Sequence, residues 1–373
     1  MEPPRGMSLF AWVKQALLDS IARGEFTPDQ PFVTQREIVE RFGVSTTTAV
    51  RALNELVADG VVVRRRGRGT FVAARPAVAR SVSGAATIAY ISPDAGSGHE
   101  SVLLAGLTAE CGELGHRVTV EHTSSVEHEV QVLRALGTGE HPVDGIVFFP
   151  RERSLAAGVV EELRRAGRPV VLVDRYFSDG PTDAVLFDDE AVGYDVTVAM
   201  IERGHTHLAV LWSEVEVTSV RDRLAGHRRA LREHGLPELP EWSALRTYSG
   251  LGVVARQERL LDWLGSATRP TALIGGNAPT VALVVHDLLA LRTDFPGSLE
   301  IGSMDQSLPF DSASPLSVVS AGLPTRAMGR EAARLIASRI EGDTGPLRHV
   351  VLPAEVRVAD RGRNTLGVIG AAP

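Results

Sequence analysis

The stretch TQREIVERFGVSTTTAVRALNELVADG, residues 34–60, decides how the N-terminal part of the chain folds. Apolar residues recur at helical spacing on both sides of Gly43-Val44-Ser45, which predicts two helices joined by a tight turn. Thr34, followed three residues later by Glu37, makes a capping box for the first helix, and Ser45 caps the second. This spacing is typical of helix-turn-helix modules, whose second helix enters the major groove of DNA.

The residues on either side of this stretch extend the module. Before it, apolar residues at helical spacing predict a helix over Leu9–Ala22. After it, the β-rich runs Val61–Val63 and Thr70–Val72 predict a hairpin whose connection, Arg64–Gly69, is basic and rich in glycine. Arginines in such a wing neutralise phosphates, and glycines let the backbone approach the minor groove. A solvated basic linker is the alternative interpretation of the charge alone.

Charge is distributed unevenly along the 373 residues. Residues 1–80 contain 12 basic and 8 acidic residues and the remainder 27 basic and 38 acidic ones, so a head of charge +4 precedes a body of charge −11. This division favours a polyanion-binding module joined to a different one. No uncharged apolar run reaches the ~18 residues of a membrane span. The single cysteine, Cys111, is typical of a reducing compartment, so we expect a cytoplasmic protein.

The body alternates between short apolar β-runs and helical stretches, after a segment, Ala74–Ala86, that reads as a linker. Strands are expected at 87–91, 117–121, 145–149, 169–173, 184–187, 207–211, 272–274 and 299–301. Helices are expected at 102–114, 126–136, 156–166, 192–203, 221–234 and 280–291. Continuous apolar strands separated by helices imply parallel sheets covered on both faces. A body of about 275 residues exceeds one core, so we expect an α/β fold with two doubly wound lobes and a cleft between them.

Several short motifs of the head occur in a characteristic order. They are Ala22-Arg23-Gly24-Glu25, Gln35-Arg36-Glu37, Gly43-Val44-Ser45, Arg51-Ala52-Leu53, Leu56, Gly60 and Gly67-Arg68-Gly69-Thr70-Phe71-Val72. With them, most of residues 9–73 resembles the GntR family of winged helix-turn-helix transcriptional regulators. The resemblance implies that the following residues contact DNA: Arg36, Ser45, Thr46, Thr47, Thr48, Arg51, Arg64, Arg66, Gly67, Arg68 and Gly69.

Two departures from the family pattern bear on DNA recognition. Family members often carry Arg where this chain has Thr46 and Val50. The absence of both arginines removes phosphate or base contacts, so the operator sequences of relatives do not predict the one that this chain binds. A winged helix that binds protein is the alternative for this module.

A second set of motifs runs along the body. They are Pro169-Val170-Val171-Leu172-Val173-Asp174-Arg175, Val185 with Asp188, Gly204-His205, Arg223-Leu224-Ala225-Gly226, Pro270-Thr271-Ala272, Asn277, Asp305, Met328-Gly329, Ala332-Ala333 and Arg361. In this order they make the body similar to the effector domain of the LacI/GalR family, which has the type I periplasmic-binding-protein fold. We therefore expect a DNA-binding domain over 1–75, a linker over 76–86 and an effector domain over 87–363. The N-lobe is expected at about 87–182 and 322–345 and the C-lobe at about 183–321 and 346–363.

The resemblance also implies where a small molecule binds. In the family, polar side chains at strand ends hold a sugar, nucleobase or similar ligand between the lobes, and the matching positions are Asp174, Ser219, Arg223, Asn277 and Asp305. Tyr248 falls near the aromatic position that stacks on the ligand, and the first loop of the body contributes Ser97 and His99. Carboxylates accept hydrogen bonds from hydroxyls, Arg donates from a fixed fork, and an aromatic face covers the C–H surface of a sugar ring.

Several of these positions have an alternative role. Asp174 and Asp305 could simply end strands, Arg223 could pair with a surface acid, and Tyr248 could be packed in the core. Ala278 stands where relatives often have Asp directly after the Asn, which weakens the case for a specific hexose-like ligand.

Two other function classes stay open at this point. Gly96 and Gly98 follow a strand and Glu121 ends the next one, which imitates a dinucleotide site and makes an NAD-linked oxidoreductase the enzyme alternative. The turn is not tight and Ser101 occupies the third glycine position, so we expect no enzyme and no cofactor. His205 and His207 have no third ligand nearby, so we expect no metal. A regulator whose body senses a protein partner is the other alternative.

These features together predict a ligand-responsive transcriptional repressor. Two copies, paired mainly through their bodies, would present two winged helices to a palindromic operator. A sugar-like effector would change the angle between the lobes and with it the spacing of the DNA-binding heads.

Overall fold

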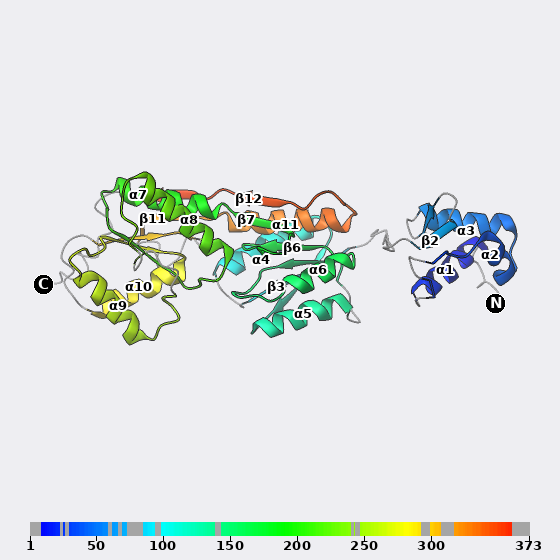
Figure 1. The fold of residues 1–373 in the computed structure, drawn as a ribbon, viewed down its shortest axis with the longest axis horizontal. Helices are drawn as coiled ribbons and strands as arrows, with labels where there is room; N and C mark the ends of the chain where they lie inside the picture. The colour runs from blue at the N-terminus through cyan, green and yellow to red at the C-terminus, as the bar shows by residue number, and fades with distance from the viewer. Residues whose placement is uncertain are drawn as a thin grey trace. The chain divides into compact units, whose positions relative to one another are not determined.

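The structure is a computed structural model that describes residues 9–22, 25–26, 30–58, 62–65, 69–72, 85–93, 98–138, 143–239, 242, 247–291, 299–306 and 317–359. The chain divides into two compact units, of which the second begins at Ala85, and Figure 1 labels the elements of both. In the part of the chain that the structure describes, no helix is both long and apolar enough to cross a bilayer.

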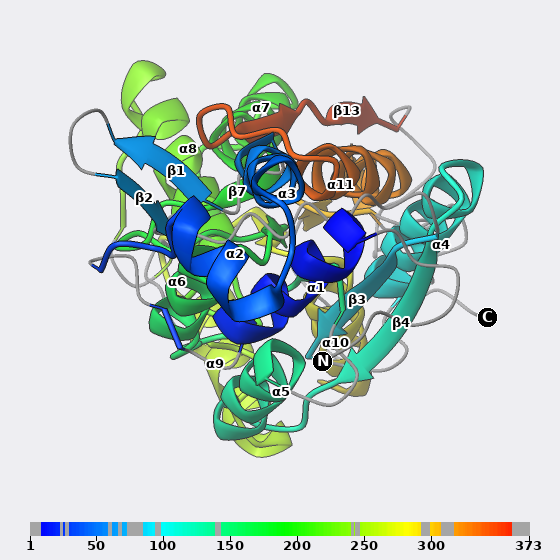
Figure 2. The same ribbon diagram turned by 90° about the vertical axis from the view of Figure 1, so that its right-hand side faces the viewer.

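The described residues of the first unit form three helices and a hairpin. The helices are α1 (Leu9–Ala22), α2 (Gln35–Phe42) and α3 (Thr46–Ala58), and the antiparallel hairpin consists of β1 (Val62–Arg65) and β2 (Gly69–Val72) (Figure 2). The helices enclose an apolar core that includes Trp12, Val13, Leu17, Ile38, Leu53 and Leu56. Thr34 and Glu37 form the expected capping box, and Gly43, with a φ of 63°, ends α2.

The second unit has two lobes, each with a sheet between two layers of helices. The N-lobe sheet has the order β12-β7-β6-β5-β3-β4, and all its pairs are parallel. Its strands are β3 (Thr87–Ser92), β4 (Arg117–His122), β5 (Gly145–Phe148), β6 (Val170–Val173), β7 (Asp183–Phe187) and β12 (His349–Leu352). One face is covered by α4 (Gly98–Glu113) and α11 (Thr325–Ile340), and the other by α5 (Val126–Thr138) and α6 (Ala157–Arg165).

The C-lobe sheet has the order β13-β11-β10-β9-β8, parallel except for the antiparallel pair of β11 and β13. Its strands are β8 (Leu208–Leu211), β9 (Ala272–Gly275), β10 (Glu300–Ser303), β11 (Ser317–Gly322) and β13 (Glu355–Val358). One face packs on α7 (Asp189–Glu202) and α8 (Thr218–Glu233), and the other on α9 (Val253–Gly265) and α10 (Ala278–Leu291).

The chain crosses between the lobes at three places, namely from β7 to α7, from β11 to α11 and from β12 to β13. The expected lobe boundaries therefore need correction. Residues 183–187 and 349–352 were assigned to the C-lobe, but β7 pairs with β6 and β12 pairs with β7, so both strands belong to the N-lobe sheet. The first and third crossings consequently lie at the C-terminal ends of β7 and β12.

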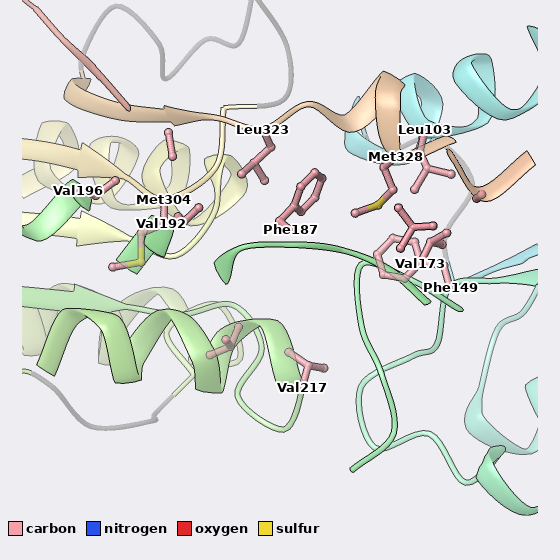
Figure 3. Packing of buried hydrophobic residues seen from close by; sticks show 14 of the residues in the cluster. Leu103, Phe149, Val173, Phe187, Val192, Val196, Val217, Met304, Leu323 and Met328 are labelled. Carbon is pink, nitrogen blue, oxygen red and sulfur yellow. The ribbon is translucent and has the colours of Figure 1, made fainter. Parts of the chain in front are cut away.

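An apolar core continues from one lobe to the other through these crossings. In Figure 3, Val192, Val196 and Met304 of the C-lobe lie on one side of Phe187 and Leu323, and Leu103, Val173 and Met328 of the N-lobe lie on the other. Phe187 ends β7 and Leu323 follows β11, so the residues that join the two groups belong to the crossings themselves. Burial of these side chains stabilises the lobes at their junction.

Candidate functional site

In the first unit, the exposed surface of α3 carries the predicted DNA contacts. Ser45 caps this helix, because its Oγ accepts a hydrogen bond from the backbone N–H of Thr48 at 3.2 Å. Thr46, Thr47 and Arg51 are exposed, and Thr47 and Arg51 share one face because they are four residues apart. The Arg51 guanidinium lies 3.9 Å from the centre of the Phe10 ring of α1, which orients it by a cation–π contact.

The remaining predicted DNA contacts lie on α2 and the hairpin. Arg36 is exposed on α2, where its Nε lies 2.9 Å from Glu40. Arg64 lies in β1 and Gly69 opens β2, opposite Arg65 in the ladder. The wing residues Arg66, Gly67 and Arg68 lie outside the described residues.

In the second unit, a buried ion pair joins the first turn of α7 to the second turn of α8. Arg223 donates from Nε to Asp189 at 2.7 Å and from Nη1 to the carbonyl of Gly276, just beyond β9, at 2.7 Å. Both charged residues are buried. Burial raises the pKa of Asp189 to about 7, with a further contribution from the charge of Asp174, and Arg223 opposes the shift. This pair therefore brings a desolvated cation to the C-terminal ends of the C-lobe strands.

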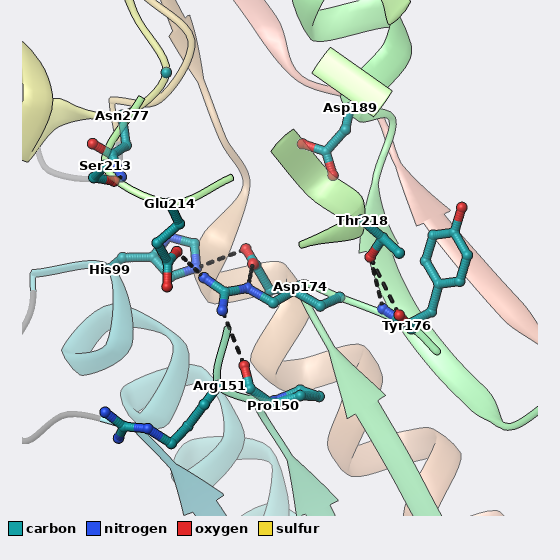
Figure 4. Close-up of polar contacts among 12 residues, drawn as sticks. His99, Pro150, Arg151, Asp174, Tyr176, Asp189, Ser213, Glu214, Thr218 and Asn277 are labelled. Carbon is teal, nitrogen blue, oxygen red and sulfur yellow. Dashed lines mark hydrogen bonds and ion pairs between the residues drawn. The ribbon is translucent and has the colours of Figure 1, made fainter. Parts of the chain in front are cut away.

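Asp174 sits opposite, directly after β6 of the N-lobe, with a φ of 67° that is unusual for a residue other than glycine. Its carboxylate lies 3.3 Å from His99 Nε2 and 3.4 Å from Arg175 Nε (Figure 4). Burial would raise the pKa of Asp174, but the hydrogen bond and charge of His99, with the charges of Arg175 and Arg223, hold it well below its usual range. The carboxylate is thus kept ionised inside the protein.

His99 completes this group of charges at the start of α4. Burial of the ring would lower its pKa, but the hydrogen bond and charge of Asp174 and the charge of Asp305 outweigh burial and raise it. Asp305, which is buried beyond β10, also acts on Arg223 electrostatically. The structure therefore brings together four of the predicted site residues, His99, Asp174, Arg223 and Asp305, from both lobes.

Contacts across the cleft hold the two lobes against each other. The Glu152 carboxylate accepts hydrogen bonds from the backbone N–H groups of Val215 at 2.7 Å and Glu216 at 2.9 Å. Arg153 pairs with Glu216 at 2.8 Å. We call residues 152–153 and 215–216 the clasp. An ion pair between Arg175 and Glu214 lies next to it (Figure 4). Every one of these bonds joins an N-lobe residue to a C-lobe residue, so opening the lobes breaks them.

Asn277 and Ser219 lie near the C-lobe side of the cleft but have structural roles in this arrangement. The Asn277 side chain donates to Ser213 Oγ at 2.6 Å and accepts from the Thr280 backbone N–H at 3.0 Å at the start of α10. Ser219 is buried in the first turn of α8. Ser97 lies outside the described residues.

Tyr248 lies in the C-lobe, where its backbone N–H donates to the Trp212 carbonyl at 2.6 Å. Its ring is fully buried, and its hydroxyl donates to Asp287 of α10 at 2.8 Å, where Arg256 of α9 also pairs. These residues belong to the layer of α9 and α10, whereas Arg223 lies in the layer of α7 and α8 on the opposite face of the sheet. In this structure Tyr248 therefore takes the alternative role of a packed core residue.

Sequence reasoning missed three residues that the structure adds to the site. Asp189 directly follows Asp188, which was singled out and which caps α7, so the neighbouring acid was the available signal. Arg175 ends the PVVLVDR motif, and its guanidinium lies 4.9 Å from the ring centre of Phe149. The rings of Phe149 and His99 also pack edge to face, with their centres 6.0 Å apart. Contacts across separate loops leave no pattern in a single sequence.

A cavity of about 330 Å³ adjoins this group of charges. Asp174 and Asp189 line it, together with Tyr176, Leu186, Phe187, Asp188, Glu190, Asp222, His349 and Val351. Its size is at the lower end for small-molecule sites.

The residues of the enzyme alternative take separate places. Gly96 lies outside the described residues, Gly98 opens α4 and Glu121 is exposed in the edge strand β4. In the described parts of the chain, no group of three or more His, Cys, Asp or Glu side chains could hold a metal ion.

Two family models match the chain. Residues 10–72 match the bacterial regulatory proteins of the gntR family, and residues 197–362 match the periplasmic binding protein-like domain. An arabinose metabolism transcriptional repressor of Halalkalibacterium halodurans is 25% identical over 345 residues, 89% of each chain. A probable fructoselysine utilization operon transcriptional repressor of Escherichia coli is 45% identical over 64 residues, 17% of this chain and 26% of its own.

A solved structure agrees with the fold of the second unit. The putative ribose operon repressor of Burkholderia thailandensis superposes with a TM-score of 0.62 at 24% identity, over 73% of this chain and 98% of its own. The two sheets and their helix layers are therefore those of an established two-lobed fold.

Proposed function

We propose that the chain is a transcriptional regulator that joins a GntR-family DNA-binding domain to a periplasmic binding protein-like domain, and that it represses its target genes until a sugar-like molecule binds between its two lobes. The observation that carries this proposal is the group His99, Asp174, Arg223 and Asp305, which comes from both lobes. A polyhydroxylated ligand needs both acceptors and donors, and these residues supply carboxylates and a guanidinium. The relatives named for arabinose and fructoselysine support a sugar.

The mechanism uses the bonds across the cleft. A ligand that contacts His99 and Asp174 on one lobe and Arg223 and Asp305 on the other interacts most strongly when the lobes are closed. It therefore shifts the equilibrium between lobe arrangements by its difference in affinity, for which a few kcal/mol suffices. In the cytoplasm, two copies on a palindromic operator would convert that shift into a change of DNA affinity.

A thermal-shift screen of sugars and nucleosides on the purified full chain tests the ligand. We expect a sugar to raise the melting temperature of the second unit, and Asp305→Ala to abolish that rise without changing DNA affinity. NAD in the same screen tests the enzyme alternative. Stabilisation by NAD with no response to any sugar would overturn the proposal.

The DNA-binding side of the proposal rests on α2 and α3. Arg36→Ala combined with Arg51→Ala removes two exposed guanidinium groups, so binding to a DNA fragment selected from a random-sequence pool should fall below detection in a mobility-shift assay. Arg357→Ala, which removes an exposed arginine of β13 in the second unit, is the matched control and should bind as before. Retained binding by the double variant would mean that this surface does not read DNA.

A further inference from the structure

A buried hydrogen-bond donor lies at the end of β8 without an acceptor. Trp212 directly follows this strand and its side chain is fully buried, yet its indole N–H has no partner among the described residues. Buried donors in folded proteins nearly always have a partner, so an unpaired one calls for an acceptor that the described residues do not supply. Tyr248, in contrast, has its hydroxyl satisfied by Asp287.

Strand alternation places Trp212 on the side of the C-lobe sheet that carries Arg223. Val210 and Trp212 pack in the core with α7 and α8, whereas Ala209 and Leu211 pack with α9 and α10. The same alternation separates Trp212 from Tyr248, which belongs to the second of these layers.

Gly276 fixes the position of the indole ring. A Cβ at Gly276 would lie 2.3 Å from Cε3 and 2.7 Å from Cζ3 of Trp212, so the ring lies directly against this glycine. The Gly276 carbonyl accepts the Nη1 hydrogen bond of Arg223 at 2.7 Å, and its N–H donates to Leu211 at 2.8 Å. The indole therefore lies against the same backbone segment that binds the buried arginine of the candidate site.

We propose that Trp212 is the aromatic residue of the effector site and that its indole N–H donates a hydrogen bond to a ring or hydroxyl oxygen of a sugar. This inference rests on the proposed function and deepens it. The indole offers an apolar ring face together with a single donor at its edge. That combination selects a molecule with a C–H face and an oxygen at its edge.

The wild-type chain allows a direct test, because it contains four tryptophans and each gives one indole resonance in a ¹H–¹⁵N spectrum. The Trp212 resonance is assigned by elimination with Phe variants of Trp12, Trp242 and Trp263. L-Arabinose, D-ribose and cellobiose serve as probes, each also measured by thermal shift and calorimetry. We expect the sugar that stabilises the chain to move the Trp212 N–H resonance downfield and to leave that of Trp263, on α9, in place.

The variant Trp212→Phe keeps an aromatic ring and removes the donor. It should bind the same sugar about tenfold more weakly, the effect of one hydrogen bond, while Trp263→Phe binds as wild type. A sugar that binds without moving the Trp212 resonance would overturn this inference and leave the proposed function standing. If none of the three sugars stabilises the chain or moves an indole resonance, the sugar ligand itself is wrong.

Discussion

Each lobe of the second unit is built around one pair of closely packed helices, α4 with α11 in the N-lobe and α7 with α8 in the C-lobe. In both pairs, glycines face the partner backbone. A Cβ on Gly106 or Gly329 would lie 2.1 Å from a backbone oxygen of the other helix, and one on Gly193 or Gly226 would lie 1.9 Å from one. Such distances exclude any side chain unless the helices move apart.

The two pairs differ in the charges that they hold. Arg223 of α8 pairs with Asp189 of α7 where both side chains are only 6% exposed. The ion pair between Arg334 of α11 and Glu110 of α4 has an arginine that is 52% exposed. The N-lobe pair is therefore mainly a scaffold that presents His99, whereas the C-lobe pair carries a site residue inside its contact. We expect changes to the C-lobe pair to affect stability and ligand binding together.

The largest effect is expected from Arg223→Met, which leaves Asp189 buried without its cation. Removing one partner of a buried ion pair costs about 3–5 kcal/mol, so the second unit should melt at a much lower temperature at pH 8. The matched variant Arg334→Met removes an arginine that is half exposed to solvent, so it should cost less than Arg223→Met even though its partner Glu110 is buried. Equal losses in the two variants would remove the distinction between the helix pairs.

The same variant has a pH dependence of defined sign. Because burial raises the pKa of Asp189 from 3.8 to about 7, its protonation favours the folded state, and this contribution is lost as the pH rises from 3.8 through 7. Without Arg223 the pKa rises further. At pH 5.5 Asp189 is mostly neutral with or without Arg223, so the destabilisation by Arg223→Met should be smaller than at pH 8. Melting temperatures of the wild type and of Arg223→Met, measured between pH 5.5 and pH 8, test this expectation. A difference between the two proteins that does not change with pH would contradict it.

A smaller effect is expected from placing a methyl group between the helices. Gly226→Ala and Gly329→Ala should each destabilise by about 1–3 kcal/mol, because the helices must separate. Gly112→Ala is a control within α4, since no atom lies within 4 Å of a Cβ there; it should be neutral or raise stability by up to about 1 kcal/mol. Only Gly226→Ala, which displaces Arg223, should also weaken sugar binding, as calorimetry can show.

The smallest effect concerns the clasp that closes the lobes. Glu152→Ala removes the acceptor for two backbone N–H groups of the C-lobe, so the closed arrangement becomes less populated and ligand affinity should fall about threefold to tenfold. Glu161→Ala, which breaks a half-buried ion pair within α6, should leave the affinity unchanged. An affinity of Glu152→Ala equal to that of wild type would show that the clasp does not contribute to closure.

The periodic parts of the fold could be predicted from the sequence. Leu9–Ala22 agrees with α1 at both ends, and the strands expected between residues 87 and 301 correspond to β3–β10. The strands β11–β13 and the helices α9 and α11 were not assigned bounds. The expected lobe boundary was wrong because a buried strand such as Asp183–Phe187 has the same continuous apolar pattern in either sheet. Only its pairing with β6 in the structure shows to which sheet it belongs.

Residues of the candidate site could be predicted where a recognisable motif places a polar side chain near the end of a strand. Asp174, Arg223 and Asp305 follow from motifs, and the structure brings them near His99. The packing of Tyr248 in the core could not be predicted, because its sequence position does not reveal which layer of the C-lobe it belongs to. Trp212 lies between a strand and a loop, and only the burial of its N–H distinguishes it.

The most direct test measures DNA affinity of the full chain by fluorescence anisotropy, on a fragment selected from a random pool, with and without a sugar that stabilises the protein. We expect at least a tenfold change in Kd for the wild type and no change for Asp305→Ala, whose DNA affinity without sugar stays normal. A Kd that saturating sugar leaves unaltered in the wild type would contradict it.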